Sequence, residues 1–156
     1  MPKITFSHVL GVKLTSRRGI GFLQKDDGEF DAITKFRGLK ASKARRVQSI
    51  MDHWVDGNDQ PVWWFHGFNE EPYRHCFVFK WDENRVHHRL YGFKCHAKPK
   101  SAKEFQLCVL IFHDTKTDAT DYRILNRINK ILADLEEVEA IGKEYPEYRG
   151  TQKWRQ

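Results

Sequence analysis

Apolar residues recur at helical spacing in the segment that begins near Ser42 and ends near Gly57. The repeating positions are Ala44, Val47, Met51, Trp54 and Val55. Steps of three and four residues place them on one face of a helix. Ser42 suits the N-cap and Gly57 the C-terminal stop. A shorter helix is expected over residues 29–37, ending at Gly38.

Strand-like patterns occur in four further segments. They cover residues 4–14, 73–81, 85–95 and 105–113. The first is closed by a polar stretch at 15–19, and residues 25–29 form a turn. The second and third are rich in β-formers and meet at a hairpin-like turn, Asp82–Asn84. The fourth is nearly all apolar, which is typical of a central strand covered on both faces.

A last helix is expected over residues 118–142, with Thr117 or Asp118 as its cap and Gly142 as its end. Its buried stripe is Tyr122, Leu125, Ile128, Leu132, Leu135 and Val138. Short connections between the predicted strands favour antiparallel pairing. The prediction is therefore one α+β domain over residues 1–156, with helices packed on one face of an antiparallel sheet and a long C-terminal helix.

Composition supports an ordinary globular domain. The chain has 156 residues, of which 40% are hydrophobic and 31% charged, so it is not disordered by composition. No apolar run approaches the roughly 20 residues that cross a membrane. The three cysteines lack a scaffold-like spacing, which favours reduced thiols and a cytoplasmic location. No membrane association is expected.

Positive charge is concentrated in the centre of the chain. The net charge is +6, and residues 74–104 alone carry eight basic and three acidic residues, a local charge of +5. Such a field attracts phosphate groups. A solvated basic face without a ligand is the alternative interpretation. Lys43, Arg45 and Arg46 lie in a first helical turn, where cations oppose the helix dipole.

Alternation along residues 85–95 places a chemically distinctive set of side chains on one face of a strand. These are Arg85, His87, Arg89 and Tyr91. His113 ends the next strand, and Lys116 follows it. Cleavage of RNA by its own 2′-hydroxyl needs a base, an acid and cations that stabilise the charged phosphate, roles that these residue types fill. An ordinary polar sheet surface is the competing interpretation.

Metal and thiol chemistry are not favoured. His75–Cys76 and Cys95–His96 lack the C-x-x-C or H-x-x-x-H spacing of zinc sites. Cys108 lies inside an apolar strand and is expected to be an inert core thiol. We therefore expect no metal and no cofactor.

At these positions the chain resembles the RelE/HigB/ParE superfamily of bacterial toxins from toxin–antitoxin pairs. The resemblance covers roughly residues 29–130. It rests on the strand RLYGF, from Arg89 to Phe93, on the apolar strand LCVLIFH, from Leu107 to His113, and on the polar stretch DTKT before a helix. The predicted order of a strand, a helical pair and an antiparallel meander also agrees with that family.

The resemblance implies a RelE-like fold and a metal-independent endoribonuclease that acts on mRNA, free or ribosome-bound. It also implies a cognate antitoxin protein that covers the basic surface. Arg89, Tyr91, His113 and Lys116 are the catalytic candidates that it implies.

The candidate RNA-binding residues are basic or imidazole side chains of the central strands and of one helix start. They are Arg74, Arg85, His87, Lys94, Lys98, Lys100, Lys43, Arg45 and Arg46. The ParE branch of the superfamily shares the fold and poisons gyrase, so fold alone does not assign an activity. A non-catalytic module that binds nucleic acid or protein through the same basic sheet is the main alternative. A structural or phage-derived protein whose charge keeps it in solution is a third.

Overall fold

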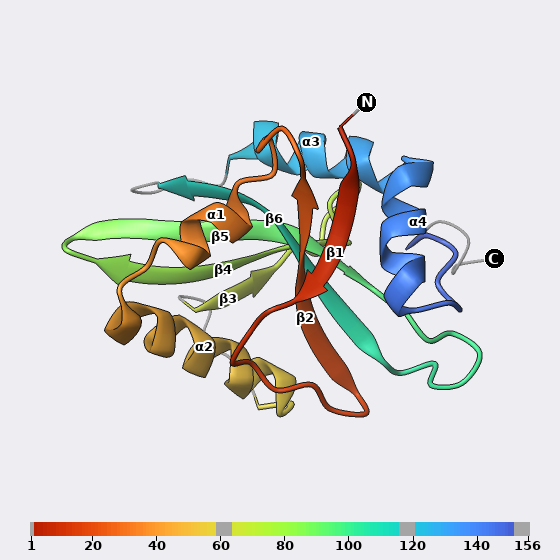
Figure 1. Ribbon diagram of the computed structural model, residues 1–156, viewed down its shortest axis with the longest axis horizontal. Helices are drawn as coiled ribbons and strands as arrows, with labels where there is room; N and C mark the ends of the chain where they lie inside the picture. Colours follow the sequence, from red (N-terminus) through yellow and green to blue (C-terminus); the bar gives the residue numbers. More distant parts are fainter. Residues whose placement is uncertain (1, 59–63, 116–120, 152–156) are drawn as a thin grey trace.

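The protein forms a six-stranded sheet with helices on both sides (Figure 1), as seen in a computed structural model that describes residues 2–58, 64–115 and 121–151. The elements are β1 Ile4–His8, β2 Arg18–Lys25, α1 Ala32–Arg37, α2 Ala41–Val55, β3 Phe65–Gly67, β4 Cys76–Glu83, β5 Val86–Cys95, β6 Gln106–Thr115, α3 Tyr122–Leu132 and α4 Leu135–Glu144. The strand order is β1-β2-β6-β5-β4-β3. All neighbouring strands are antiparallel except β2 and β6, which run parallel. The predicted α+β class is confirmed.

Strand β2 is absent from the sequence prediction, although it lies between β1 and β6 inside the sheet. It contains Gly19 and Gly21, and glycine weakens the local strand signal. The structure explains the second glycine, because a β-carbon at Gly21 would collide with the ring of Phe6 on β1. The expected strand over residues 4–14 ends earlier, at His8.

The helices cover both faces of the sheet, so the prediction that they pack on one face is wrong. On one side, α1 and α2 bury Phe36, Met51 and Trp54 against residues such as Phe79 on β4. On the other side, α3 and α4 pack on a second core that the alternate strand positions supply. The central strands β5 and β6 contribute apolar residues to both cores, since alternate side chains of a strand point to opposite faces.

The expected long C-terminal helix is two helices, α3 and α4, and this too corrects the prediction. Asp121 caps α3 by accepting a hydrogen bond from the Arg123 N–H, and Asp134 caps α4 in the same way from Glu136. The predicted caps Thr117 and Asp118 lie outside the described residues. Gly142 does not end the helix, which continues to Glu144.

The break between α3 and α4 changes which residues of α4 are buried. Leu135, predicted in the apolar stripe, is 74% exposed. Glu137 is fully buried, together with Ala140 and Ile141. A capping Asp at 134 starts a new helix whose buried face is rotated relative to α3. A single stripe across both helices is therefore not maintained.

A β-bulge interrupts the pairing of β5 and β6. Tyr91 pairs with Phe112 and Gly92 pairs with Leu110, so Ile111 is the extra residue. Downstream of the bulge, His113 pairs with Leu90 and Asp114 with Arg89. Without the extra residue, His113 would pair with Arg89 and lie on its face. The bulge therefore moves His113 to the opposite face of the sheet.

Gly92 permits the close strand approach at this bulge, and its replacement by alanine is expected to destabilise the protein. A β-carbon at Gly92 would collide with the backbone carbonyl of Val109, which a flexible side chain cannot relieve. We expect Gly92→Ala to cost about 3 kcal/mol of unfolding free energy in urea denaturation. Gly142→Ala is the matched control, since nothing lies within 4 Å of its β-carbon. Equal stability of the two variants would contradict the assigned register.

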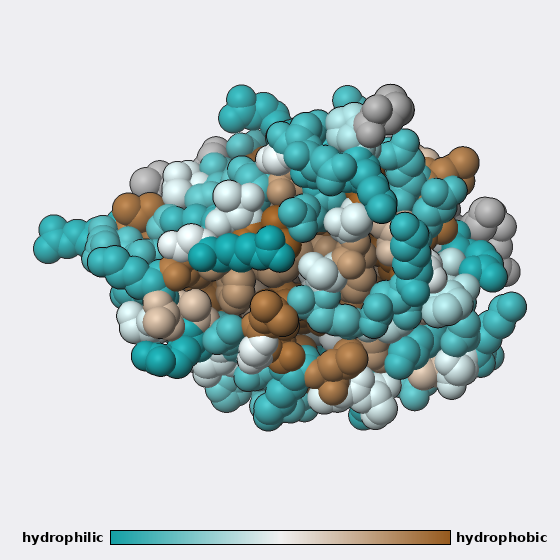
Figure 2. All heavy atoms as spheres, in the orientation of Figure 1, coloured by the Kyte–Doolittle hydropathy of each residue, from teal (hydrophilic) through white to brown (hydrophobic). Residues whose placement is uncertain are grey.

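The surface of the face that carries α1 and α2 is mostly hydrophilic (Figure 2), with hydrophobic residues visible between the two helices. Leu10 and Leu14, in the connection between β1 and β2, are exposed large apolar side chains. In the described part of the chain, no helix combines the length and apolar character needed to cross a membrane.

Candidate nucleic-acid interface

A surface cavity of about 480 Å³ lies at the β4–β5 hairpin and is lined by basic, imidazole and indole groups. We call it the hairpin groove. Its lining residues are Arg46, Trp64, Lys80, Trp81, Asp82, His87, His88 and Arg89. They come from α2, from the residue before β3, and from the two strands of the hairpin, which extends away from the helices at one end of the sheet (Figure 1).

Lys80 and Arg89 are direct cross-strand partners in this groove, and they make it positively charged. Burial, with the nearby Arg89 charge as a second cause, lowers the pKa of the Lys80 ammonium. His66 on β3 shares their face of the sheet, because its partner Val78 lies two positions from Lys80. Burial first, then the charges of Lys80 and Arg89, lower the pKa of His66. These effects indicate a local field that favours an anion.

The hairpin also carries acidic groups that reduce this field. Asp82 lines the groove and accepts a hydrogen bond from the Nδ1 side of the exposed His87 ring. Asp114 is the partner of Arg89 on β6, and its Oδ1 accepts the Thr115 N–H. The groove lining itself therefore has three permanent cations, Arg46, Lys80 and Arg89, against one carboxylate.

Arg89 is hydrogen-bonded to Tyr91, which lies on the same face of β5. The Arg89 Nη1 donates to the Tyr91 hydroxyl at 3.3 Å, and the arginine is only 9% exposed. Tyr91 itself is fully buried in the core under α3 and α4. The structure therefore places Arg89 at the groove and Tyr91 behind it, so Tyr91 orients the guanidinium and does not reach the surface.

His88 and His113 form a hydrogen-bonded pair on the opposite face of the sheet, beside α1. The His88 Nδ1 lies 3.0 Å from the His113 Nε2, and the ring centroids are 5.3 Å apart. Trp81 stacks on His88, with ring centroids 5.1 Å apart and an interplanar angle of 15°, and the centroid of its ring lies 6.4 Å from that of His113. The Nε2 of His88 lies 3.8 Å from a Glu83 carboxylate oxygen. That distance is too long for a hydrogen bond, so the hydrogen bond of this group is the one between the two imidazoles.

Both imidazoles of this pair are held in the neutral form at neutral pH. Burial, with the Lys35 charge on α1 as the next cause, lowers the pKa of His88, while Glu83 and Asp82 raise it. Burial, Lys35 and His88 lower the pKa of His113 to about 4, against an opposing effect of Asp31. A neutral imidazole is able to accept a proton, which is the requirement for a general base.

The two tryptophans of the groove differ in exposure. Trp81 is buried, whereas Trp64 is half-buried and has its ring 6.3 Å from the ring of His53 on α2. A partly exposed indole beside a cationic groove offers a face on which a nucleic-acid base stacks. Trp64 is thus the aromatic side chain of the groove that is open to such contact.

No family model, curated protein or solved structure matches this chain. Among the described residues, no group of three or more His, Cys, Asp or Glu side chains is arranged to hold a metal ion. The functional assignment therefore depends on the geometry of the site.

The site residues predicted from the sequence do not all lie in the hairpin groove. Arg46, His87 and Arg89 line the hairpin groove. His113 contacts His88 but does not line the groove, and Lys116 lies outside the described residues. Of the three predicted catalytic residues that the structure describes, Arg89 and Tyr91 therefore share one face of the sheet and His113 lies on the other.

The remaining predicted binding residues lie elsewhere. Arg74 and Lys94 line a different pocket. The Lys98 ammonium lies 4.5 Å from the centroid of the Phe105 ring, and the Lys100 N–H donates to Glu147. Arg85 is exposed in the hairpin turn with a φ of 64°. Lys43 and Arg45 are on α2 but outside the groove lining.

The predicted site omits five of the groove residues, namely Trp64, Lys80, Trp81, Asp82 and His88, and Lys80 and His88 are the cation and the imidazole among them. The alternating pattern of β4 and β5 assigns each of them to a face, but it does not give the register that pairs Lys80 with Arg89. The hairpin turn at residues 82–85 sets that register, and the same turn brings His88 next to Trp81. A register derived from the turn would have identified both residues.

Proposed function

We propose that this protein is a metal-independent endoribonuclease of the RelE-like toxin type that binds RNA in the hairpin groove. The observation that carries the proposal is that one cavity is lined by the cross-strand cations Lys80 and Arg89, by the His88 imidazole that His113 contacts from outside the groove, and by the partly exposed indole of Trp64. Cations bind the phosphate, the imidazole accepts a proton, and the indole stacks on a base.

In the proposed reaction, His88 accepts the proton of the RNA 2′-hydroxyl. The 2′-oxygen then forms a bond to phosphorus, and the bond from phosphorus to the 5′-oxygen of the next nucleotide breaks. His87, the second imidazole of the groove, donates a proton to that leaving oxygen. Lys80 and Arg89 stabilise the additional negative charge on the phosphate. The products are a 2′,3′-cyclic phosphate and a free 5′-hydroxyl.

The element order supports the toxin assignment. Strand β2, the helical pair α1–α2 and, after the short strand β3, the meander β4–β5–β6 occur in this order along the chain, in the order that the resemblance implies. The proposal includes its partners, an RNA substrate that is free or ribosome-bound and an antitoxin protein. An acidic antitoxin segment lying over Arg46, Lys80 and Arg89 would neutralise the groove.

Removing the positive charge of Lys80 is expected to weaken cleavage at least tenfold. Lys80 is half-buried and forms a pair with Arg89 directly across the hairpin, so Lys80→Gln removes one of the two cations that hold the phosphate. The measurement is cleavage of labelled RNA by the purified protein in EDTA, together with growth of cells in which the protein is induced. Lys130→Gln, an exposed charge change on α3, is the control. A wild-type protein that neither cleaves RNA nor slows growth contradicts the proposal.

A non-catalytic RNA-binding module is the second candidate. It is favoured by the burial of Tyr91 and by the position of His113 on the face opposite Arg89. It predicts RNA binding that weakens steeply with salt and is lost with Lys80→Gln, while the RNA remains intact. Intact RNA under conditions of saturating binding separates this candidate from the nuclease.

A further inference from the structure

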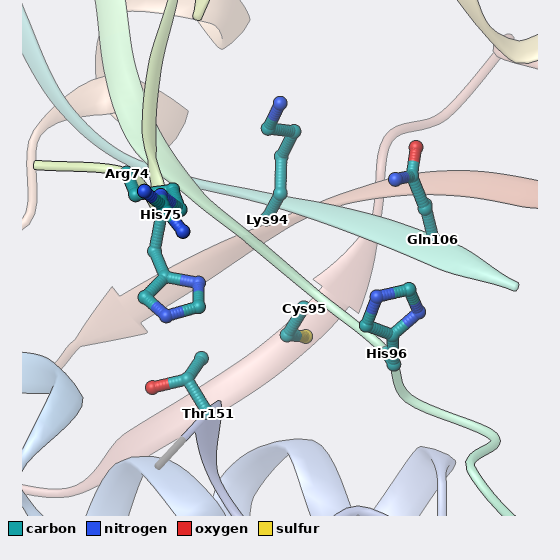
Figure 3. A pocket seen from close by; sticks show the side chains of 7 residues that line it. All are labelled: Arg74, His75, Lys94, Cys95, His96, Gln106 and Thr151. Carbon is teal, nitrogen blue, oxygen red and sulfur yellow. The ribbon is translucent and has the colours of Figure 1, made fainter. Parts of the chain in front are cut away.

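A second pocket lies at the opposite end of β5 from the hairpin turn. It has a volume of about 340 Å³, and we call it the strand-end pocket. Its described lining residues are Arg74, His75, Lys94, Cys95, His96, Gln106 and Thr151. They come from the segment before β4, the end of β5, the start of β6 and the residues after α4. Figure 3 shows His75 and His96 on either side of Cys95, with Lys94 and Gln106 projecting away from Thr151.

Nearly every side chain of this pocket is a hydrogen-bond donor. Arginine and lysine donate only, and the imidazole, amide and hydroxyl groups all carry N–H or O–H donors. The set includes two permanent cations, Arg74 and Lys94, and the described lining contains no carboxylate. A concave surface lined by donors and positive charge is suited to an anion with several acceptor oxygens.

The cysteine in the pocket does not reduce its positive charge. Burial raises the pKa of the Cys95 thiol well above its ordinary value, so the sulfur stays protonated and neutral at physiological pH. A protonated thiol is also a poor metal ligand, because metals bind the thiolate. The chemistry of the lining therefore favours an anion over a cation.

The charged groups of the pocket are accessible. Arg74 forms an ion pair with Glu71 through its Nε, at 3.2 Å, but both side chains are more than half exposed. A pair of that exposure contributes little free energy, and the guanidinium has four further N–H donors. The Lys94 ammonium lies 5.8 Å from the centroid of the Phe65 ring. Arg74 is thus open to a ligand, and Lys94 is half-buried at the pocket wall.

The pocket is separate from the hairpin groove. Lys94 is five residues along β5 from Arg89, which corresponds to about 17 Å of extended strand. The two sites share no described lining residue. The volume lies at the small end of the range for ligand pockets, about 300–1,000 Å³, which suits a single nucleotide unit.

We propose that the strand-end pocket binds a phosphate group of a single nucleotide unit, held by Arg74 and Lys94. The phosphate belongs either to a free mononucleotide or to a nucleotide of an RNA chain. The pocket thereby gives the protein a second anion site that does not depend on cleavage in the hairpin groove.

The test is calorimetric titration of the full chain with adenosine 5′-monophosphate, with adenosine as the uncharged comparison. We expect the nucleotide to bind, adenosine to bind at least tenfold more weakly, and Arg74→Gln and Lys94→Gln each to weaken nucleotide binding about tenfold. Lys130→Gln, an exposed charge change on α3, is expected to leave the affinity unchanged. Lys80→Gln is expected to leave it unchanged as well, because Lys80 belongs to the other site.

Competition with a short single-stranded RNA identifies the source of the phosphate. If RNA displaces the nucleotide from the Lys80→Gln variant, the pocket binds a phosphate of an RNA chain. If the nucleotide binds and RNA does not displace it, the pocket binds a free mononucleotide. The proposal is overturned if the nucleotide does not bind to the folded wild type. It is also overturned if Lys130→Gln weakens binding as much as Lys94→Gln, since the attraction is then non-specific. Neither result bears on cleavage in the hairpin groove.

Discussion

Replacing Glu137 with glutamine is expected to stabilise the protein at alkaline pH by about 5 kcal/mol, the equivalent of a pKa raised from 4.5 to about 8. Glu137 is fully buried on α4, and burial raises its pKa from 4.5 to about 8. Its Oε1 accepts a hydrogen bond from the Tyr148 hydroxyl at 2.7 Å. A glutamine keeps that acceptor and carries no charge at any pH.

The sign of the pH dependence follows from the direction of the shift. The folded state holds the Glu137 proton up to about pH 8, whereas the unfolded chain releases it near pH 4.5. The stability that this proton provides is therefore complete below pH 4.5 and is lost as the pH rises to about 8. Wild type should lose stability across this interval, and Glu137→Gln should lose much less.

Urea denaturation at pH 5 and pH 9 measures the effect. Glu136→Gln is the matched control, because Glu136 is the neighbouring residue of the same helix and is exposed. It should change the unfolding free energy by less than about 0.5 kcal/mol at either pH. If Glu137→Gln and wild type lose equal stability between the two pH values, Glu137 is not a buried, protonated carboxyl.

Elements with a strong local pattern could be predicted from the sequence. The segments 73–81, 85–95 and 105–113 correspond to β4, β5 and β6, and the apolar face of α2 was placed on the correct residues. The prediction misses strand β2, whose Gly21 accommodates the ring of Phe6 on the neighbouring strand, a contact that is not local in the sequence. A single sequence shows the glycine but not the ring that requires it.

The candidate site was predictable only in part. Alternation placed Arg89 and His87 correctly at the hairpin, because neighbouring side chains of a strand point to opposite faces. The β-bulge at Ile111 places His113 on the other face. One extra residue in an apolar strand does not change its hydrophobic pattern, so the bulge could not be predicted from the sequence. Similarly, the break at Asp134 buried Glu137 and exposed Leu135, which a continuous stripe does not predict.

The bulge has a consequence for the site. It brings His113 next to His88 beside α1, where burial and then the Lys35 charge lower the pKa of both imidazoles. In a regular sheet, His113 would lie beside Arg89, where its imidazole would be next to a guanidinium. The fold thus places Lys80 and Arg89 on one face of the sheet and His88 and His113 on the other, and the groove lining includes Lys80, Arg89 and His88.

Replacing His88 is expected to reduce RNA cleavage by about 100-fold to 10,000-fold, the usual contribution of general acid–base catalysis. His88 lines the groove and is hydrogen-bonded to His113, whose role is to position the ring of His88. His88→Gln keeps a polar side chain of similar length but cannot accept the proton. His113→Gln should cause a smaller loss, about tenfold, because it retains a hydrogen-bonding group at the Nδ1 of His88.

The pH dependence distinguishes these roles. Burial and the Lys35 charge lower the pKa of His88, so the neutral ring persists below pH 6.5 and the acid limb of the cleavage profile should lie below that pH. Lys35→Gln removes the charge, which should raise the His88 pKa and move the limb to higher pH, while Arg37→Gln on the same helix should not. NMR titration of the two histidines reports the same shift without substrate. Suppose that the histidine resonances of Lys35→Gln titrate at higher pH while the acid limb of its cleavage profile stays in place. His88 is then excluded as the base, because another group limits cleavage.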